Sequence, residues 1–248
     1  MAGTTLRRRL GSPWRVAELV DAAPETPTAR TLRFAVPGWP GHLPGQHVDV
    51  RLTAEDGYTA QRSYSLSAPA AGEVIEMTVQ LVPVGEVSPY LVGDIAPGDS
   101  LEVRGPLGGW FVWAPGRPEP ALLIGGGSGV APLMAMVRAR RAAEAGGPLR
   151  LLYSVRSPAD AFYAAELHDS DGAQVRVLYT RVGPGAELRS PHRIDADDLA
   201  ALGWAADFLP LCYVCGPTPF VEAMADELVR AGHDPARIRT ERFGAGGG

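Results

Sequence analysis

The sequence predicts two domains, an antiparallel six-stranded β-barrel followed by an α/β domain with a five-stranded parallel sheet. The first half of the chain has a hydrophobic period of two, whereas the second half alternates apolar strand-like runs with helical segments. A stretch with three prolines separates the halves. We divide the 248 residues into a flexible N-terminus (1–12), a barrel (13–114), a linker (115–120), an α/β domain (121–244) and a glycine-rich tail (245–248).

The barrel prediction depends on alternation of apolar and polar residues, which is clearest at residues 46–52 and 75–81. In the second run Ile75 and Met77 alternate with Glu76, as expected for half-buried antiparallel strands. A short helix is expected near residues 88–92. Further strand-like runs punctuated by Pro and Gly turns complete the predicted closed barrel, at residues 16–20, 31–36, 58–66 and 101–104.

The second half predicts strands that are continuously apolar and helices that are amphipathic. In the first helix Val130, Leu133 and Val137 share one side, whereas Arg138 and Arg141 lie off it. This combination is typical of a parallel sheet covered on both faces, which binds nucleotides at the carboxyl ends of its strands. We expect strands at 121–124, 149–155, 175–180, 211–215 and 238–242, and helices at 130–145, 159–167 and 220–231.

Composition argues against several classes of function. The formal net charge is -5 and the pI is near 5.6, so a nucleic-acid backbone is not the expected partner. All 23 basic residues are arginine, which indicates a compositional bias across the chain. No apolar run approaches the roughly 18 residues of a membrane span. Arg7 to Arg9 are followed by Leu10-Gly11-Ser12-Pro13 rather than by an apolar run, which argues against an export signal. We expect a cytoplasmic protein that is a monomer.

The two cysteines, Cys212 and Cys215, are too few for the four thiolates of an iron–sulfur cluster. Both lie in one predicted strand, where residues three apart face opposite ways. A disulfide or a shared metal is therefore not expected. The five histidines also lack metal-ligand spacing, so no metal site is predicted.

A glycine-rich loop, Gly125-Gly126-Gly127-Ser128-Gly129-Val130-Ala131-Pro132, connects the first strand of the α/β domain to its first helix. Without side chains its backbone can approach a pyrophosphate, whose charge is met by the amides of the helix N-terminus. The spacing is not the strict G-x-G-x-x-G, because Val130 and Pro132 stand where a third glycine is needed. A structural tight turn is the alternative. The predicted dinucleotide contacts are Gly126, Gly127, Ser128, Gly129 and Pro132.

The barrel strand that carries Arg62-Ser63-Tyr64-Ser65 precedes this loop, which in turn precedes Cys215-Gly216-Pro217. In their order and spacing, the three motifs resemble those of the ferredoxin-NADP reductase superfamily. The resemblance extends from about residue 14 to residue 244. It implies a flavin-binding barrel, a domain for a nicotinamide dinucleotide, and a stand-alone flavin/NAD(P)H reductase without an iron–sulfur domain.

By the same resemblance, Arg62 binds the flavin pyrophosphate, Tyr64 packs against the isoalloxazine ring and Ser65 bonds near flavin N5. The chemistry of each side chain suits its role. A guanidinium fork matches phosphate oxygens, and a hydroxyl can donate to N5 of the oxidised flavin or accept from the N5–H of the reduced flavin. Alternation along the strand puts Arg62 and Tyr64 on one face. An ordinary barrel strand with an exposed arginine is the alternative.

A second segment, Gly85-Glu86-Val87-Ser88, resembles the second flavin-phosphate segment of the family. Gly85, Val87 and Ser88 are its predicted contacts, and the Ser88 hydroxyl would face an anion at a helix start. A plain capped helix is the alternative. Because FAD has a second phosphate and FMN does not, this segment favours FAD, with FMN left open.

At the end of its strand, Cys215 stands where the family places a thiol beside the nicotinamide C4, followed by Gly216 and Pro217. Glu241 and Phe243 resemble the family's last segment near the flavin, where they would influence proton traffic and shield the ring. A buried structural cysteine is the alternative for Cys215. The chain departs from the plant-type pattern, which ends in an aromatic residue, because here four further residues follow Gly244.

Arg156 and Arg181 follow the second and third predicted strands of the α/β domain, where a 2'-phosphate calls for arginine. Arg156 therefore favours NADPH, with NADH left open. Because every basic residue of the chain is arginine, solvated surface arginines are the alternative. The predicted function is hydride transfer from NADPH to bound FAD, and then electron transfer to a separate acceptor protein such as a ferredoxin. Two alternatives remain: a flavin-holding electron-transfer subunit without independent turnover, and a direct reductase of free flavin or quinone.

Overall fold

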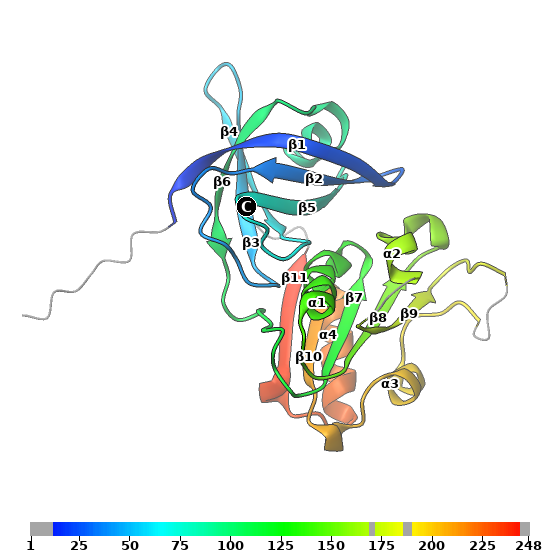
Figure 1. Ribbon diagram of the computed structural model, residues 1–248. Helices are drawn as coiled ribbons and strands as arrows, with labels where there is room; N and C mark the ends of the chain where they lie inside the picture. Colours follow the sequence, from blue (N-terminus) through cyan, green and yellow to red (C-terminus); the bar gives the residue numbers. More distant parts are fainter. Residues whose placement is uncertain (1–11, 169–171, 186–189, 244–248) are drawn as a thin grey trace, which may run out of the picture.

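The computed structural model describes residues 12–168, 172–185 and 190–243. The predicted flexible N-terminus, apart from Ser12, and the predicted glycine-rich tail lie outside these residues. The described chain folds into a β-barrel and an α/β domain that lie one above the other (Figure 1). Among the described helices, none combines the length and the hydropathy that a membrane span requires.

The barrel is a six-stranded sheet with the order β4-β3-β6-β1-β2-β5, and every neighbouring pair is antiparallel. An antiparallel bridge between Leu66 and Met77 brings the end of β4 against β5 and closes the sheet. Alternate side chains such as Leu32, Phe34 and Val50 fill the interior, as the period of two predicts. The strands are β1 (Trp14–Thr26), β2 (Ala29–Ala35), β3 (His47–Thr53), β4 (Thr59–Ser65), β5 (Val74–Gln80) and β6 (Ser100–Leu107).

The short helix expected at residues 88–92 begins two residues later. It is a single π-helical turn, Tyr90–Asp94, in which the Ile95 N–H donates to the Tyr90 carbonyl over five residues. Pro89 precedes it and has no N–H to donate to a helix. The turn anchors itself in the barrel through the buried side chain of Leu91.

The α/β domain contains a parallel five-stranded sheet with the order β11-β10-β7-β8-β9. All five predicted strands are present, with ends that differ by no more than two residues. Cys215 and Cys212 belong to different apolar clusters on the two faces of this sheet, and both are free thiols. The elements are β7 (Ala121–Gly126), α1 (Val130–Ala142), β8 (Leu149–Val155), α2 (Ala164–His168), β9 (Gln174–Tyr179), α3 (Ala196–Leu202), β10 (Leu211–Pro217), α4 (Thr218–Arg230) and β11 (Ile238–Phe243).

Two helices differ from the prediction. The helix expected at 159–167 is reduced to α2, because Tyr163 has a φ of 55° that a continuous right-handed helix does not admit. The unpredicted α3 begins at a capping box, in which Asp195 accepts from the Asp198 N–H and the Asp198 side chain accepts from the Asp195 N–H.

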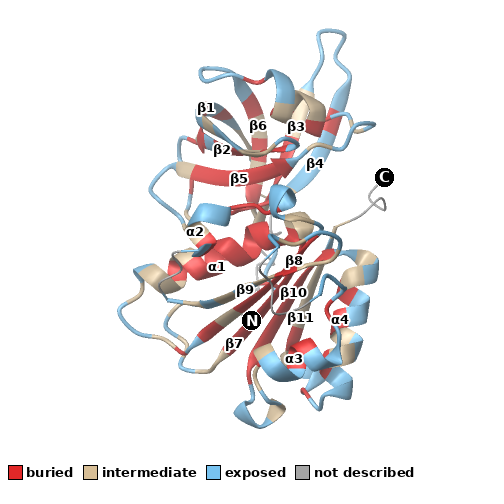
Figure 2. Cartoon of the chain, turned by 90° about the vertical axis from the view of Figure 1, so that its right-hand side faces the viewer, coloured by how far each residue is buried: buried red, intermediate tan, exposed pale blue. Residues whose placement is uncertain are grey.

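Helix α1 is buried on nearly all sides, unlike the amphipathic helix that the sequence indicates. Nine of its 13 residues are buried, including all of residues 130–137, and most of α1 is red in Figure 2. The sheet covers one side of α1, whereas the barrel approaches the other. Gly45 shows how close this approach is, because a Cβ there would lie 2.8 Å from Met136 Cε and 1.9 Å from the Phe111 carbonyl oxygen.

Candidate functional site

The predicted flavin strand and the predicted nicotinamide strand meet where the two domains join. His47 on β3 is the register partner of Ser65 at the end of β4, so the two side chains share one face. His47 Nδ1 lies 3.9 Å from Glu241 Oε1 on β11, and Glu241 Oε2 accepts from the Cys215 thiol at 3.8 Å. The structure thus brings Ser65, Glu241 and Cys215 into one group, in which His47 lies between Ser65 and Glu241, and Glu241 contacts Cys215.

The Ser65 hydroxyl is buried, and among the described residues it has no hydrogen-bond partner. Burying a hydroxyl without a partner costs free energy, on the order of 1–3 kcal/mol. Such a group fits a site whose hydrogen-bonding partner is a ligand. The residues present therefore fit the flavin that the sequence predicts at this strand.

Glu241 and Cys215 both hold their protons more tightly than usual. Burial raises the pKa of Glu241 to about 7 from an ordinary value of 4.5, although the thiol of Cys215 partly opposes the shift. Burial, then the charge of Glu241, raises the pKa of Cys215 well above its ordinary range. Cys215 therefore remains a thiol at neutral pH, and Glu241 is a carboxyl group that can exchange a proton near pH 7.

The raised pKa of Glu241 predicts a pH-dependent stability. Between about pH 4.5 and pH 7 the folded protein binds a proton that the unfolded chain releases, so the stability contributed by this proton falls as the pH rises. We expect the free energy of unfolding of wild type, relative to Glu241→Gln, to fall by about 3 kcal/mol from pH 4.5 to pH 8. Urea denaturation of both proteins at each pH measures it, and parallel curves would contradict the pKa.

The glycine loop lies against the end of β10. A Cβ at Gly129 would be 2.2 Å from the Cys215 carbonyl oxygen, and one at Gly126 would be 2.7 Å from the ring of Phe220. Gly127 has a φ of +55°, and nothing would lie within 4 Å of its Cβ, so its outer side is open. Ser128 is half-buried beside it, whereas Pro132 is buried in the first turn of α1. The open backbone fits a pyrophosphate at this helix start.

Arg62 lies next to the predicted second phosphate segment. Its Nη2 is 3.1 Å from Glu86 Oε2, and the other carboxylate oxygen, Glu86 Oε1, accepts from the Tyr58 hydroxyl at 2.5 Å. Arg62 is about half exposed, so its fork is accessible to an anion. Tyr64, on the same face, is half-buried against the barrel core, and burial raises its pKa to about 12. This tyrosine therefore remains neutral.

In the predicted second phosphate segment, residues 85–88, some polar groups already make hydrogen bonds within the protein. The Ser88 hydroxyl accepts from the Val82 N–H at 3.0 Å, and the Gly85 N–H donates to the Val82 carbonyl at 2.8 Å. Val87 is buried in the barrel core. Ser88 thus closes a turn, and its part in phosphate binding stays a prediction.

The remaining predicted contacts lie at the carboxyl ends of the parallel strands. The Arg181 N–H donates to the Arg156 carbonyl at 3.0 Å, and both arginines are exposed, so the two charges lie at one edge of the sheet. Phe243, at the end of β11, is the register partner of Pro217 and packs against the core of the domain. Gly216, which stands between Cys215 and Pro217 in β10, is buried.

Sequence reasoning missed three residues of this site, namely His47, Glu86 and Phe220. His47 was not among the predicted site residues, because its pairing with Ser65 depends on strand register. Phe220 was seen only as the start of a helix. Glu86 stands inside a predicted segment, and its negative charge next to a predicted phosphate site was a signal that could have been used.

Two family models match the chain. The oxidoreductase FAD-binding domain matches residues 17–112, and the oxidoreductase NAD-binding domain matches residues 123–226. The matches coincide with the barrel and with most of the α/β domain. This chain belongs to the ferredoxin-NADP reductase superfamily.

The relatives of this chain include reductase components of oxygenase systems. The reductase component of the naphthalene 1,2-dioxygenase system of Pseudomonas putida is 29% identical over 95% of this chain and 71% of its own length. The glycine betaine monooxygenase reductase subunit of Pseudomonas aeruginosa is 32% identical over 81% of this chain, which spans 56% of that protein. The cytochrome P450 reductase of Amycolatopsis has a similar structure, with a TM-score of 0.79 and 26% identity over 97% of this chain and 73% of its own.

Several predictions from the sequence are confirmed by these matches. The two-domain fold is that of the superfamily, and the cofactors are FAD and a nicotinamide dinucleotide. The enzyme class is an NAD(P)H-dependent flavoprotein reductase.

Proposed function

We propose that this reductase takes hydride from NADPH into bound FAD and passes the electrons to a separate protein, a ferredoxin or an oxygenase component. The observation that carries the proposal is the group of Ser65, His47, Glu241 and Cys215, which joins the flavin strand to the nicotinamide strand. When bound, FAD supplies the chemistry, because it accepts two electrons as hydride and can release them singly. The protein supplies orientation.

Arg62, Tyr64 and Ser65 would hold the flavin half of FAD. Beside the Arg62–Glu86 pair, an open pocket of about 770 Å³ has Glu86, Tyr58 and Tyr90 on its wall. Space for the second half of a dinucleotide is therefore available next to the guanidinium, which supports FAD rather than FMN.

The glycine loop would hold the dinucleotide of NADPH, and Arg156 with Arg181 would bind its 2'-phosphate. We expect Arg156→Ala to raise the KM for NADPH about tenfold, because one charge-assisted contact is lost, and to change the KM for NADH less than twofold. Initial rates with both nucleotides measure it. Arg176→Ala, an exposed arginine of β9, is the control. Equal effects on both nucleotides would contradict the assignment.

Glu241, Cys215 and His47 would control protons beside the flavin. Glu241 holds a proton below about pH 7 and can release it above. Burial lowers the pKa of His47, although the charge of Asp49 opposes the shift, so His47 is neutral at pH 7 and can accept a proton. Cys215 offers a small side chain that admits a planar ring.

A separate electron acceptor is supported by the relatives, whose names describe reductase components of dioxygenase and monooxygenase systems. We also propose that the protein is a cytoplasmic monomer. Its two free cysteines suit a reducing compartment.

Anaerobic stopped-flow mixing of the FAD-loaded protein with NADPH tests the function. We expect the flavin absorbance near 450 nm to bleach and an added ferredoxin to restore it. No bleaching with either nicotinamide nucleotide would overturn the proposal. Rapid turnover with free flavin or quinone but none with any protein acceptor would favour the direct reductase.

A further inference from the structure

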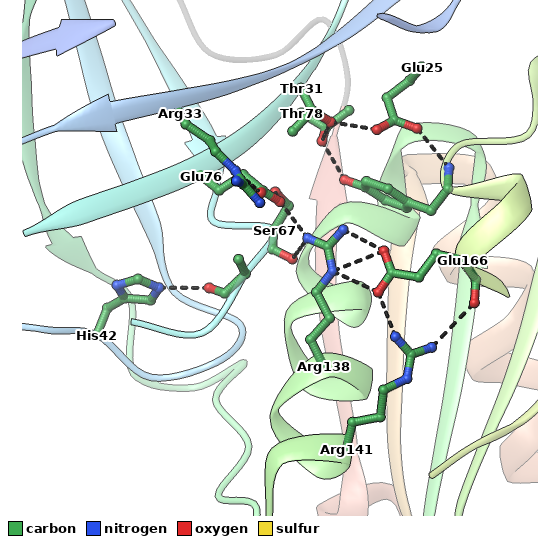
Figure 3. Close-up of polar contacts among 12 residues, drawn as sticks. Glu25, Thr31, Arg33, His42, Ser67, Glu76, Thr78, Arg138, Arg141 and Glu166 are labelled. Atoms are coloured by element: carbon green, nitrogen blue, oxygen red, sulfur yellow. Dashed lines mark hydrogen bonds and ion pairs between the residues drawn. The ribbon is translucent and has the colours of Figure 1, made fainter. Parts of the chain in front are cut away.

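Arg138 extends from α1 to the barrel and contacts both domains. Its Nη1 donates to the Ser67 carbonyl at 3.0 Å and to a carboxylate oxygen of Glu76 (Figure 3). On the other side of the guanidinium, Nε and Nη2 donate to Glu166 of α2 at 3.0 and 2.6 Å. A planar fork with donors along both edges can make these contacts at once, which a lysine cannot.

Glu76 is the barrel side of this contact. It lies on β5 with only 5% of its side chain exposed, and it also accepts from Arg33 Nε and from the Ser67 hydroxyl, each at 2.9 Å. Burial alone would raise its pKa, but the charge of Arg138 and the hydrogen bonds from Arg33, Ser67 and Arg138 outweigh burial, so the pKa is lowered. Glu76 is therefore a buried anion, and Arg138 is one of the two cations that balance it.

Tyr163, directly before α2, makes a second link between the domains. Its N–H donates to Glu25 Oε2 of β1 at 2.9 Å, and its hydroxyl donates to Thr78 of β5 (Figure 3). The φ of 55° is uncommon for an aromatic residue and persists only where surrounding contacts hold it. The Arg138 guanidinium lies 5.0 Å from the centroid of the Tyr163 ring, so the two links form one cluster.

This cluster connects the two cofactor motifs. Arg138 lies on the helix that begins directly after the glycine loop, and Ser67 lies two residues beyond Ser65 at the end of the flavin strand. Because a helix and a closed barrel each behave as a rigid body, a contact between them fixes the position of the glycine loop relative to the flavin strand. Geometry at this junction matters, because a misplacement of about 1 Å between reacting groups can cost about a hundredfold in rate.

We propose that the Arg138–Glu76 ion pair is an interdomain clamp that sets the glycine loop against the flavin strand. Arg138 is then a positioning residue for hydride transfer between the two cofactors. This role rests on the proposed function, whereas the clamp itself does not. Removing the Arg138 charge leaves Glu76 buried and undercompensated, so the domains separate or shift.

The test compares Arg138→Met with Arg141→Met in the full chain. Arg141 pairs with the same Glu166 carboxylate at 2.6 Å, and this ion pair joins α1 to α2 within one domain. At saturating NADPH we expect flavin reduction to slow at least tenfold in Arg138→Met and less than twofold in Arg141→Met. The Kd for FAD and the rate of flavin reduction by dithionite should change less than twofold in both. Arg138→Lys should recover part of the rate.

A second readout needs no cofactor. In the apo protein, hydrogen exchange of the Tyr163 amide should accelerate at least tenfold in Arg138→Met and remain near wild type in Arg141→Met. Glu76→Gln keeps oxygen and shape but removes the charge. It should reproduce both effects, and combining it with Arg138→Met should add little, which keeps the test decisive if Arg138→Met folds poorly.

The outcomes separate the two ideas. Wild-type flavin that NADPH does not reduce refutes the proposed function, while Tyr163 exchange still reports on the clamp. The positioning role is refuted if NADPH reduces the flavin of the wild type, and if Arg138→Met and Glu76→Gln reduce their flavin as fast as Arg141→Met at saturating NADPH. Unchanged Tyr163 exchange in both clamp variants refutes the clamp.

Discussion

Replacing Arg62 by alanine is expected to raise the Kd for FAD between about tenfold and a hundredfold. Hydrogen bonds to charged groups contribute about 1.5–3 kcal/mol, and a fork that meets phosphate oxygens makes more than one of them. In the structure the Arg62 side chain is about half exposed, and its Nη2 lies 3.1 Å from a carboxylate oxygen of Glu86. Titration of apo protein with FAD, followed by quenching of flavin fluorescence, measures the change.

Two further variants make this prediction specific. Arg62→Lys retains the charge but not the fork, so its Kd should lie between those of wild type and Arg62→Ala. Glu86→Gln removes an anion that competes with phosphate for the same guanidinium, so its Kd should fall about twofold to fivefold. Arg176→Ala should bind FAD as wild type does. An unchanged Kd in Arg62→Ala would remove Arg62 from the flavin site.

Local sequence patterns predicted those parts of the fold that depend on local physics. Alternation at residues 75–81 predicted β5, because one face of the strand packs in the barrel core and imposes a period of two. The expected half-burial was wrong, because Glu76 and Thr78 on the other face are buried against Arg138 and Tyr163 of the α/β domain. The run at 149–155, which is apolar apart from Arg150 and Ser154, predicted β8 with its observed ends. Helix α3 was missed because its start signal is the Asp195 capping box, which precedes only a short apolar run.

Contacts between distant segments were beyond such patterns. His47 meets Ser65 because β3 and β4 pair in one register, and it meets Glu241 because β11 approaches the barrel. Arg138 was placed off the apolar side of α1, which is correct within its own domain. It is half-buried because the barrel covers that side, and no periodicity within one helix reports on a second domain.

Gly129→Ala is expected to slow flavin reduction by NADPH at least about a hundredfold while FAD binding changes little. The added Cβ would lie 2.2 Å from the Cys215 carbonyl oxygen and 2.6 Å from the Gly216 nitrogen. Both atoms are backbone, so the loop and the end of β10 must move apart instead of a side chain turning away. Such a displacement changes the position of the nicotinamide ring relative to the flavin. The rate of hydride transfer depends steeply on that geometry.

The flavin barrel should tolerate this change, because its core is separate from the cluster that contains Cys215. Overpacking costs about 1–3 kcal/mol, so the free energy of unfolding of the α/β domain should fall by that amount. Gly116→Ala is the control, since nothing would lie within 4 Å of its Cβ. Stopped-flow reduction by NADPH, compared with dithionite reduction of the same samples, separates nicotinamide placement from flavin chemistry. A Gly129→Ala protein that NADPH reduces at the wild-type rate would show that the loop and β10 need not pack closely for transfer.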